Sequence, residues 1–292
     1  MSTPLPLRAI FWPIVLAIVI LLTLLIVPTV GRVSETAHRT VEAANLREIA
    51  QANLIYAMDH NDNLPVAADV WDYARILADE SGLNTPAIWL SKNDPAWDAT
   101  TTVPATIVIT DAAKPRPLDP AFRQLKPSVA VALGKLNSRM PATTPIAWTR
   151  GLQPDGTWSP HSPNGTHGGF VTFIGGNTSF FKDLTSNGGE LVRFDRKGST
   201  ANILDALPPG TRIGEYTPTP DEQTAWAKSI AWRQKLGPLK PYTPPLFLAI
   251  LWLPFVAISV YRLLKRQRGA FLVLLWPVAF SVVLFLLTPG CW

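Results

Sequence analysis

This chain has a single cysteine, no acidic residue near either end and no repeat. Each of these features excludes a class of fold or function. Its one cysteine, Cys291, has no partner for an internal disulfide, so the fold depends on a packed core. All 21 acidic residues lie between Glu35 and Glu222. No internal repeat is present, and the hydrolase motif Gly-x-Ser-x-Gly does not occur. The sequence therefore indicates neither a repeat architecture nor a nucleophile elbow.

The formal charge of +5 comes from the ends of the chain. Between Arg32 and Lys240, 21 basic residues balance the 21 acidic ones. The excess consists of Arg8 and of four basic residues in the segment 262–268. These residues flank apolar runs, so they indicate orientation in a membrane rather than binding to a polyanion. We expect no nucleic-acid partner.

Three long runs carry no charged residue: Ala9–Val30, Pro241–Tyr261 and Gly269–Trp292. The first has 22 residues, and a helix rising ~1.5 Å per residue would span a hydrocarbon core of ~30 Å with that length. The sequence therefore predicts three membrane spans, with the lipid bilayer as one partner.

Arg8 and the basic loop 262–268 are expected in the cytoplasm by the positive-inside rule. The segment between the first two runs then lies on the periplasmic side of the inner membrane. We predict an anchor over residues 1–30, an extracytoplasmic domain over 31–240 and a two-helix transmembrane hairpin over 241–292.

The segment Val33–His60 contains neither glycine nor proline and alternates polar and apolar residues at helical spacing. We predict a spine helix over residues 31–60, which ends where Asp59–Pro65 favours a turn. The apolar stripe expected to face the core comprises Val33, Ala37, Val41 and Ala44, followed by Leu46, Ile49, Asn53 and Tyr56.

The rest of the predicted domain reads as short elements around a small antiparallel sheet. The clearest is a hairpin over residues 169–182, turning at Gly175-Gly176. Further predictions are helices over Val70–Ser81 and Asp221–Lys235 and strands over Thr106–Thr110, Ser128–Leu133, Thr143–Thr149 and Glu190–Asp195. The predicted fold class is thus an α+β membrane protein.

Four motifs occur in an order that is known from one family. They are Pro28-Thr-Val-Gly-Arg-Val-Ser, Ala44-Asn-Leu-Arg-Glu-Ile-Ala, Tyr56-Ala-Met-Asp-His-Asn-Asp-Asn-Leu-Pro, and Gly168-Gly-Phe-Val-Thr-Phe-Ile-Gly-Gly-Asn-Thr-Ser-Phe-Phe. In this order the chain resembles the pilin-like proteins of type IV pili and type II secretion, the pseudopilins. The resemblance covers roughly Ala9 to Leu184.

The resemblance implies a long helix packed on a small antiparallel sheet. It also implies a non-enzymatic, structural or interaction component of a bacterial envelope assembly, with protein partners there. Aligned on Pro28, the chain has Pro6 and Phe11 where the family has the glycine before the processing site and an early glutamate. We therefore predict that the N-terminus is not processed. A minor pseudopilin of a secretion or pilus-like system is the alternative.

Two groups of polar residues contain side chains that can bind a metal ion. Asp59, Asn61 and Asn63 match the first ligands of a calcium loop, but Leu64 and Val70 occupy the positions of its glycine and glutamate. We interpret them as a turn that ends the helix.

His161 and His167 bracket a polar loop just before the hairpin. Two imidazoles can bind zinc, but no cysteine or carboxylate stands near them in sequence to complete four ligands. An envelope hydrolase using this loop is a second alternative. Our expectation is a solvated loop, no catalytic, metal or cofactor residue, and no small-molecule substrate.

Overall fold

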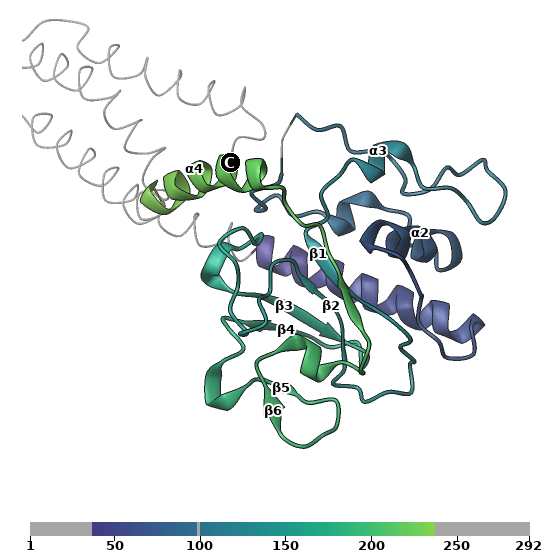
Figure 1. Ribbon diagram of the computed structural model, residues 1–292. Coiled ribbons are helices and arrows are strands. Elements are labelled where there is room, and N and C mark those ends of the chain that lie inside the picture. Colours follow the sequence, from purple (N-terminus) through teal and green to yellow (C-terminus); the bar gives the residue numbers. More distant parts are fainter. Residues whose placement is uncertain (1–36, 98–99, 237–292) are drawn as a thin grey trace, which may run out of the picture. The chain divides into compact units, whose positions relative to one another are not determined.

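The computed structural model describes residues 37–97 and 100–236 of the chain, as mixed helix and antiparallel sheet (Figure 1). Contacts gather Thr36–Gln234 into one compact unit. The helix and sheet content agrees with the α+β part of the predicted fold class.

No helix in these ranges is long and apolar enough to cross a membrane. On this finding, the membrane part of the prediction is wrong. Both of the longest described helices, over residues 37–59 and 220–236, carry charged side chains. The predicted membrane fold class and the multi-pass location in the inner membrane are corrected accordingly. The apolar runs on which they rested, 9–30, 241–261 and 269–292, lie outside the described residues.

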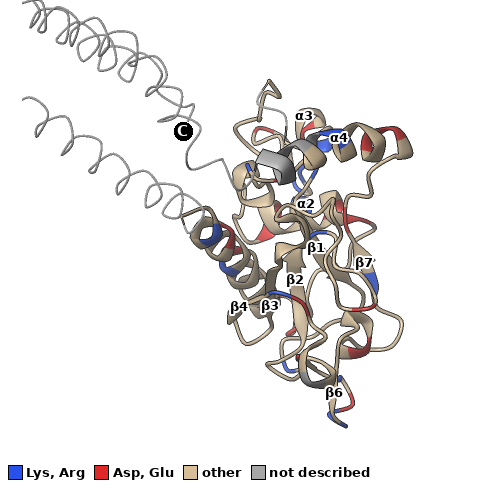
Figure 2. Ribbon diagram, turned by 90° about the vertical axis from the view of Figure 1, so that its left-hand side faces the viewer, with Lys and Arg blue, Asp and Glu red and all other residues tan. Residues whose placement is uncertain are grey.

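The spine helix is described over residues 37–59. It ends as predicted, because Asn61 and Asp62 adopt positive φ angles of 53° and 65°. Its inner face buries Leu46 and Ile49 against the sheet. Figure 2 shows the helix along one side of the strands.

The predicted core stripe is wrong in the first half of this helix. Ala37, Val41 and Ala44 are exposed, and Val41 retains 57% of its accessible surface. The sheet covers the side of the helix that carries Leu46 and Ile49, which lies well around the axis from these three residues. The spine helix therefore has apolar side chains on two faces.

The main sheet is antiparallel throughout, with strand order β4-β3-β2-β1-β7. Its strands are β1 (Val129–Leu133), β2 (Pro145–Thr149), β3 (Gly169–Phe173), β4 (Thr178–Phe181) and β7 (Arg212–Gly214). A separate pair consists of β5 (Leu191–Val192) and β6 (Ser199–Thr200). The predicted hairpin is confirmed as β3 and β4, turning where Gly176 has a φ of 80°.

The remaining helices include the two predicted ones. They are α2 (Val70–Glu80), α3 (Pro120–Arg123) and α4 (Pro220–Leu236), with short 3₁₀ turns at Pro86–Trp89, Gly165–His167, Ser186–Gly188 and Ile203–Ala206. Asp69 caps α2 by accepting a hydrogen bond from the backbone N–H of Asp72 at 2.8 Å.

Both faces of the sheet are buried along its three central strands, β1, β2 and β3. Alternation along β1 sends Val129, Val131 and Leu133 toward the spine helix and α2, and Ala130 and Ala132 toward the opposite cluster. That second cluster includes Leu191 of β5 and the turn Ile203–Ala206, together with Ala50 and Ala57 of the spine helix. The small strand pair and this turn thus complete the core on the second face of the sheet.

The predicted strand Thr106–Thr110 is wrong, since this segment forms only an isolated bridge between Val108 and Leu118. The side chain of Asn84 accepts hydrogen bonds from the backbone N–H groups of Ile107 and Val108, at 2.8 and 3.1 Å. An amide side chain therefore takes the donors that a neighbouring strand would need. Strand β7 was not predicted.

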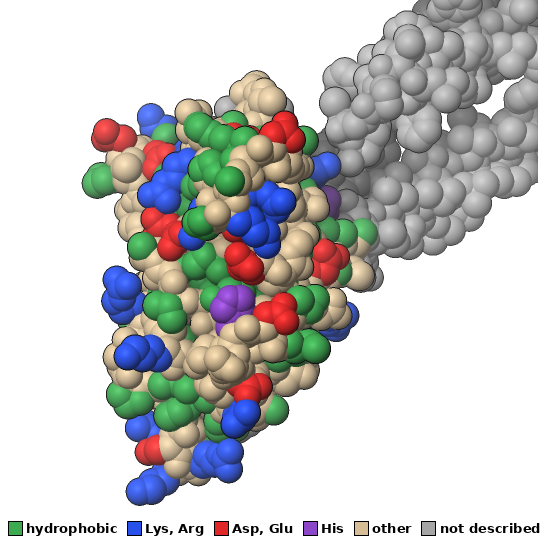
Figure 3. Space-filling view, turned by 90° about the vertical axis from the view of Figure 1, so that its right-hand side faces the viewer, with side chains coloured by type: hydrophobic (Ala, Val, Ile, Leu, Met, Phe, Trp, Pro, Cys, Tyr) green, Lys and Arg blue, Asp and Glu red, His purple; other side chains and the backbone are tan. Residues whose placement is uncertain are grey.

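Charged side chains of both signs are interspersed with apolar ones on the face shown in Figure 3. This distribution fits the balanced charge of the segment 32–240.

Candidate functional site

Buried and half-buried polar residues gather at the end of the sheet where β1 begins and β2 ends. These two ends meet because the strands are antiparallel, with Val129 opposite Thr149. We call this group the polar cluster; it comprises Glu42, Ser91, Asp94, Ser128, Arg150, His161, Asn164, Glu215, Tyr216, Glu222 and Trp226.

The centre of the polar cluster is an ion pair between Asp94 and Arg150. A guanidinium nitrogen of Arg150 lies 2.6 Å from the Asp94 carboxylate, and the two side chains are 2% and 1% exposed. The same nitrogen donates to the backbone carbonyl of His161 at 3.2 Å. Burial raises the pKa of Asp94, and this effect outweighs the opposing effects of Arg150 and of the hydrogen bonds to the carboxylate.

Two aromatic rings pack near the guanidinium of Arg150. Its central carbon lies 5.4 Å from the ring centre of Tyr216 and 5.5 Å from that of Trp226. Lys126 lies at 5.9 and 5.6 Å from the same two rings. A cation over the face of an aromatic ring is attracted to the ring, and the attraction is stronger where water is excluded. These contacts hold the start of α4, which carries Trp226, against this end of the sheet.

Glu222 fixes the first turn of α4 through three neighbours. Its carboxylate pairs with Lys126 at 2.6 Å and accepts hydrogen bonds from the Tyr216 hydroxyl and from the backbone N–H of Thr219. Partial burial acts to raise the pKa of Glu222, but these hydrogen bonds outweigh it and lower the pKa to about 2. Burial and the bond to Glu222 raise the pKa of Tyr216.

Glu215 closes the cluster beside Arg150. It accepts a hydrogen bond from the backbone N–H of Gly151 at 3.1 Å, and burial raises the pKa of its carboxyl group. Gly151 has a φ of 88°, and a Cβ there would lie 3.0 Å from the Cβ of Ser162. Glycine is therefore required at this position on both grounds.

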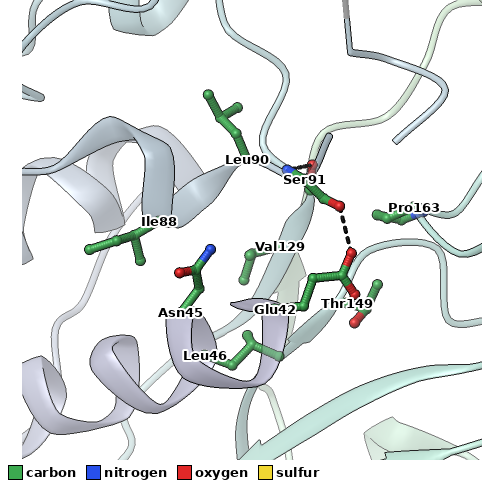
Figure 4. Close-up of a pocket in the computed structure, with 10 residues that line it drawn as sticks. Glu42, Asn45, Leu46, Ile88, Leu90, Ser91, Val129, Thr149 and Pro163 are labelled. Atoms are coloured by element: carbon green, nitrogen blue, oxygen red, sulfur yellow. Dashed lines mark hydrogen bonds between the residues drawn. The ribbon is translucent and has the colours of Figure 1, made fainter. Parts of the chain in front are cut away.

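The spine helix contributes Glu42, which Figure 4 shows pointing at Ser91. The Ser91 hydroxyl donates to one carboxylate oxygen at 2.5 Å, and the Asn164 amide donates to the other at 2.8 Å. Ser128 accepts from the backbone N–H of Ser91 at 2.8 Å. Glu42 thus joins the spine helix directly to two other segments of the chain, and through Ser91 to Ser128.

A cavity of about 20 Å³ lies beside Glu42. It is lined by Glu42, Asn45, Leu46, Ile88, Leu90, Ser91, Ser128, Val129, Thr149 and Pro163 (Figure 4). A volume of this size has room for about one water molecule. The cavity is therefore far too small for an organic substrate.

Three buried atoms of the polar cluster have no hydrogen-bond partner among the described residues: Asp94 Oδ2, Arg150 Nη1 and His161 Nδ1. A buried ion pair that is not fully hydrogen-bonded contributes little net stability, although removing one member is costly. The pair therefore acts mainly to fix the positions of the segments that it joins.

The two histidines of the loop before the hairpin, His161 and His167, have different surroundings. The ring of His161 lies 6.2 Å from that of Trp226, whereas His167 is exposed in the turn Gly165–His167. Within ranges 37–97 and 100–236, no group of three or more His, Cys, Asp or Glu residues is placed to hold a metal ion. The fold therefore does not bring to this loop the carboxylate ligands that a zinc site would need.

The calcium-like segment forms the turn that we predicted. Asp62 pairs with Arg139 and accepts a hydrogen bond from the Ser138 hydroxyl at 3.2 Å, while Asn63 donates to the carbonyl of His60 at 3.1 Å. Asp62 thus ties this turn to the segment 138–139, and Asn63 bonds within the turn.

Sequence reasoning missed most of the polar cluster because its members come from distant segments. Asp94 and Arg150 are 56 positions apart, and Glu42 and Asn164 are 122 apart. The one local signal was Arg150 itself, a charged residue directly after a buried strand. Comparisons of the chain with protein-family models, with curated proteins and with solved structures find no match.

Proposed function

We propose that this chain is a pilin-like, non-enzymatic protein that acts as a structural or interaction component of a protein assembly. The observation that carries this proposal is the two-faced spine helix. One face packs on the antiparallel sheet, and the opposite face presents Val41, Ile55 and Met58, which are 57%, 47% and 82% exposed.

Single exposed apolar side chains are ordinary on a protein surface, but a group on one helix face is characteristic of a contact surface. Val41 and Ile55 are 14 positions apart, which at 3.6 residues per turn returns to nearly the same side of the helix. Among the described residues the contacts to the sheet come from Leu46 and Ile49 on the other side of the helix, and this side is left exposed. A partner protein would bury it.

The polar cluster supports the non-enzymatic part of the proposal, because it lacks the space for a substrate. Its central ion pair is almost completely buried, and the neighbouring cavity holds about one water molecule. A hydrolase based on His161 needs an open site at the imidazole, and this ring packs on Trp226 instead. The cluster is better suited to fixing α4 and the loops than to binding a substrate.

The proposal is tested by photo-crosslinking in cells that express the full chain. A photoreactive amino acid replaces Ile55 in one variant and Leu204 in a matched control, because Leu204 is a similarly exposed apolar residue, at 42%, outside the spine helix. We expect discrete crosslinks to protein from position 55 and far fewer from position 204. Equal crosslinking from both positions would contradict the proposal.

The enzymatic alternative has its own test. Purified chain is assayed against panels of ester, peptide and glycoside substrates, alongside a His161→Ala variant of equal stability. Turnover that disappears in this variant would show that the protein is an enzyme and that the proposal is wrong.

A further inference from the structure

The exposed side of the spine helix carries residues at alternating spacings of four and three. They are Ala37, Val41, Ala44, Glu48, Gln51, Ile55 and Met58, all of which are exposed. We call them the outer seam. A repeat with a mean spacing of 3.5 residues is the pattern by which one helix packs along another.

The outer seam from Val41 to Met58 is nearly symmetrical about its midpoint. Two apolar residues stand at each end, and two polar ones, Glu48 and Gln51, stand in the middle. A surface with this order reads the same way from both directions. A two-fold axis requires a self-complementary surface of this kind, because each contact must occur twice.

We infer that the outer seam binds the outer seam of a second copy of this chain, with the two helices antiparallel. The inference rests on the proposed function, since it names one partner of the interaction surface. With the two-fold axis between positions 48 and 51, Val41 meets Met58 of the second copy and Ala44 meets its Ile55. Each of these layers pairs a smaller side chain with a larger one, as close packing requires.

Charge selects the antiparallel orientation. In the antiparallel pair the Glu48 carboxylate lies opposite Gln51 of the second copy, and an amide is a donor that a carboxylate accepts. In a parallel pair in register, each Glu48 would face Glu48 of the second copy, and like charges at an interface repel. The parallel pair would also stack Ala44 on Ala44 and Met58 on Met58, which leaves layers of unequal width.

The interface is short. Val41 and Met58 are 17 positions apart, so the contact extends for about 26 Å at ~1.5 Å per residue. A contact of this extent belongs to the small, transient class of protein interfaces. The pair is therefore expected to form and separate readily.

Disulfide trapping tests the inference in the full chain, with Cys291 replaced by serine. Two differently tagged copies, one carrying Val41→Cys and the other Met58→Cys, are expressed together and mildly oxidised in cells. We expect the mixed 41–58 dimer in at least about fivefold excess over the 41–41 and 58–58 dimers. A Lys197→Cys variant on the exposed turn between β5 and β6 measures random collisions.

Exchanging the residues at the exposed positions Glu48 and Gln51 provides a second test, again measured as the amount of mixed dimer. Gln51→Glu places two carboxylates opposite each other in both halves of the pair, so we expect about threefold less mixed dimer. The double variant Glu48→Gln/Gln51→Glu restores the complementary pair and should restore the dimer.

Dominant 58–58 crosslinks would overturn the antiparallel arrangement, and crosslinking no greater than at position 197 would overturn the pairing itself. Neither result would touch the proposed function if position 55 still crosslinks to another protein. Conversely, a trapped 41–58 dimer in a protein with enzymatic turnover would remove the proposed function and leave the pairing intact.

Discussion

Ile49 and Ile55 lie on one helix six positions apart and have opposite surroundings. Ile49 is completely buried against the sheet, whereas Ile55 is 47% exposed. Their side chains are chemically identical, so the difference comes from the position of the sheet alone. A helix with apolar residues on two sides has one side that folds the chain and another that remains available for a partner.

The inner face also shows how polar groups are accommodated in a core. Asn53 is fully buried, but its amide donates to the Ile49 carbonyl at 2.8 Å and its carbonyl accepts from the Tyr73 hydroxyl. Burial raises the pKa of Tyr73, so the hydroxyl remains a donor. The outer face has Glu48 and Gln51 in the open instead. Polar residues inside are paired within the chain, and those outside are free to pair with another molecule.

The largest expected effect belongs to Ile49→Asp on the inner face. A buried carboxylate without a partner destabilises the fold by several kcal/mol, so we expect a loss of about 4 kcal/mol or more, or no folded protein. Leu46→Asp should behave alike. Urea denaturation and protease resistance measure the loss, with Arg47→Ala on the exposed side as a control within about 0.5 kcal/mol. Wild-type resistance in both Asp variants would show that the inner face is misassigned.

The next effect concerns the Asp94–Arg150 pair. Arg150→Met leaves the Asp94 carboxylate buried and unpaired, which costs about 3–5 kcal/mol in comparable pairs. The double variant Arg150→Met/Asp94→Leu removes both charges and should be clearly more stable than the single one. Denaturant unfolding of the three proteins tests this. If the single variant unfolds like the wild type, the pair does not hold the cluster together.

A smaller effect is expected from Tyr73→Phe. It removes the donor to Asn53 and leaves a buried carbonyl without a partner, at a cost of about 1–3 kcal/mol. Adding Asn53→Leu removes the unsatisfied group as well and should recover part of the loss. Thermal or urea unfolding measures the free energy of unfolding of each variant. A double variant that loses more stability than the two single variants added together would contradict this pairing.

The pH dependence of α4 follows from Glu222. Its pKa is lowered from 4.5 to about 2, so the stabilisation is complete above about pH 4.5 and is lost as the pH falls toward 2. The raised pKa values of Asp94 and Glu215 act in the opposite sense, because protonation at low pH favours their buried state. The protection factors of residues 221–228 against hydrogen exchange, which are corrected for the slower intrinsic exchange in acid, should therefore fall below pH 4 in the wild type. Glu222→Gln should have lower protection factors at neutral pH and lose most of this pH dependence; an unchanged profile would contradict the role of Glu222.

Local patterns in the sequence were sufficient for the elements that local chemistry determines. The turn after the spine helix and the β3–β4 hairpin depend on neighbouring residues, and both were predicted. Strand β7 was missed because its three residues form a strand only beside β1. The strand expected at Thr106–Thr110 failed because Asn84, more than twenty positions earlier, takes its backbone donors.

The polar cluster and the two faces of the spine helix required the tertiary structure. Asp94 becomes a partner of Arg150 only when the ends of β1 and β2 meet. Along the spine helix, Val41 and Ala44 have the composition of a core stripe, and only the placement of the sheet shows them to be exposed. The membrane assignment was overturned by the finding that no described helix is suited to span a bilayer.

Ile55→Asp separates folding from binding in one experiment. Position 55 is exposed, so the free energy of unfolding should change by no more than about 0.5 kcal/mol. The same change places a carboxylate among the apolar residues at one end of the outer seam, so protein crosslinks from a photoreactive residue at Val41 should disappear. Normal stability with crosslinks lost is the result that we predict. Normal stability with crosslinks unchanged would contradict the assignment of the outer face of the spine helix as a protein-binding surface.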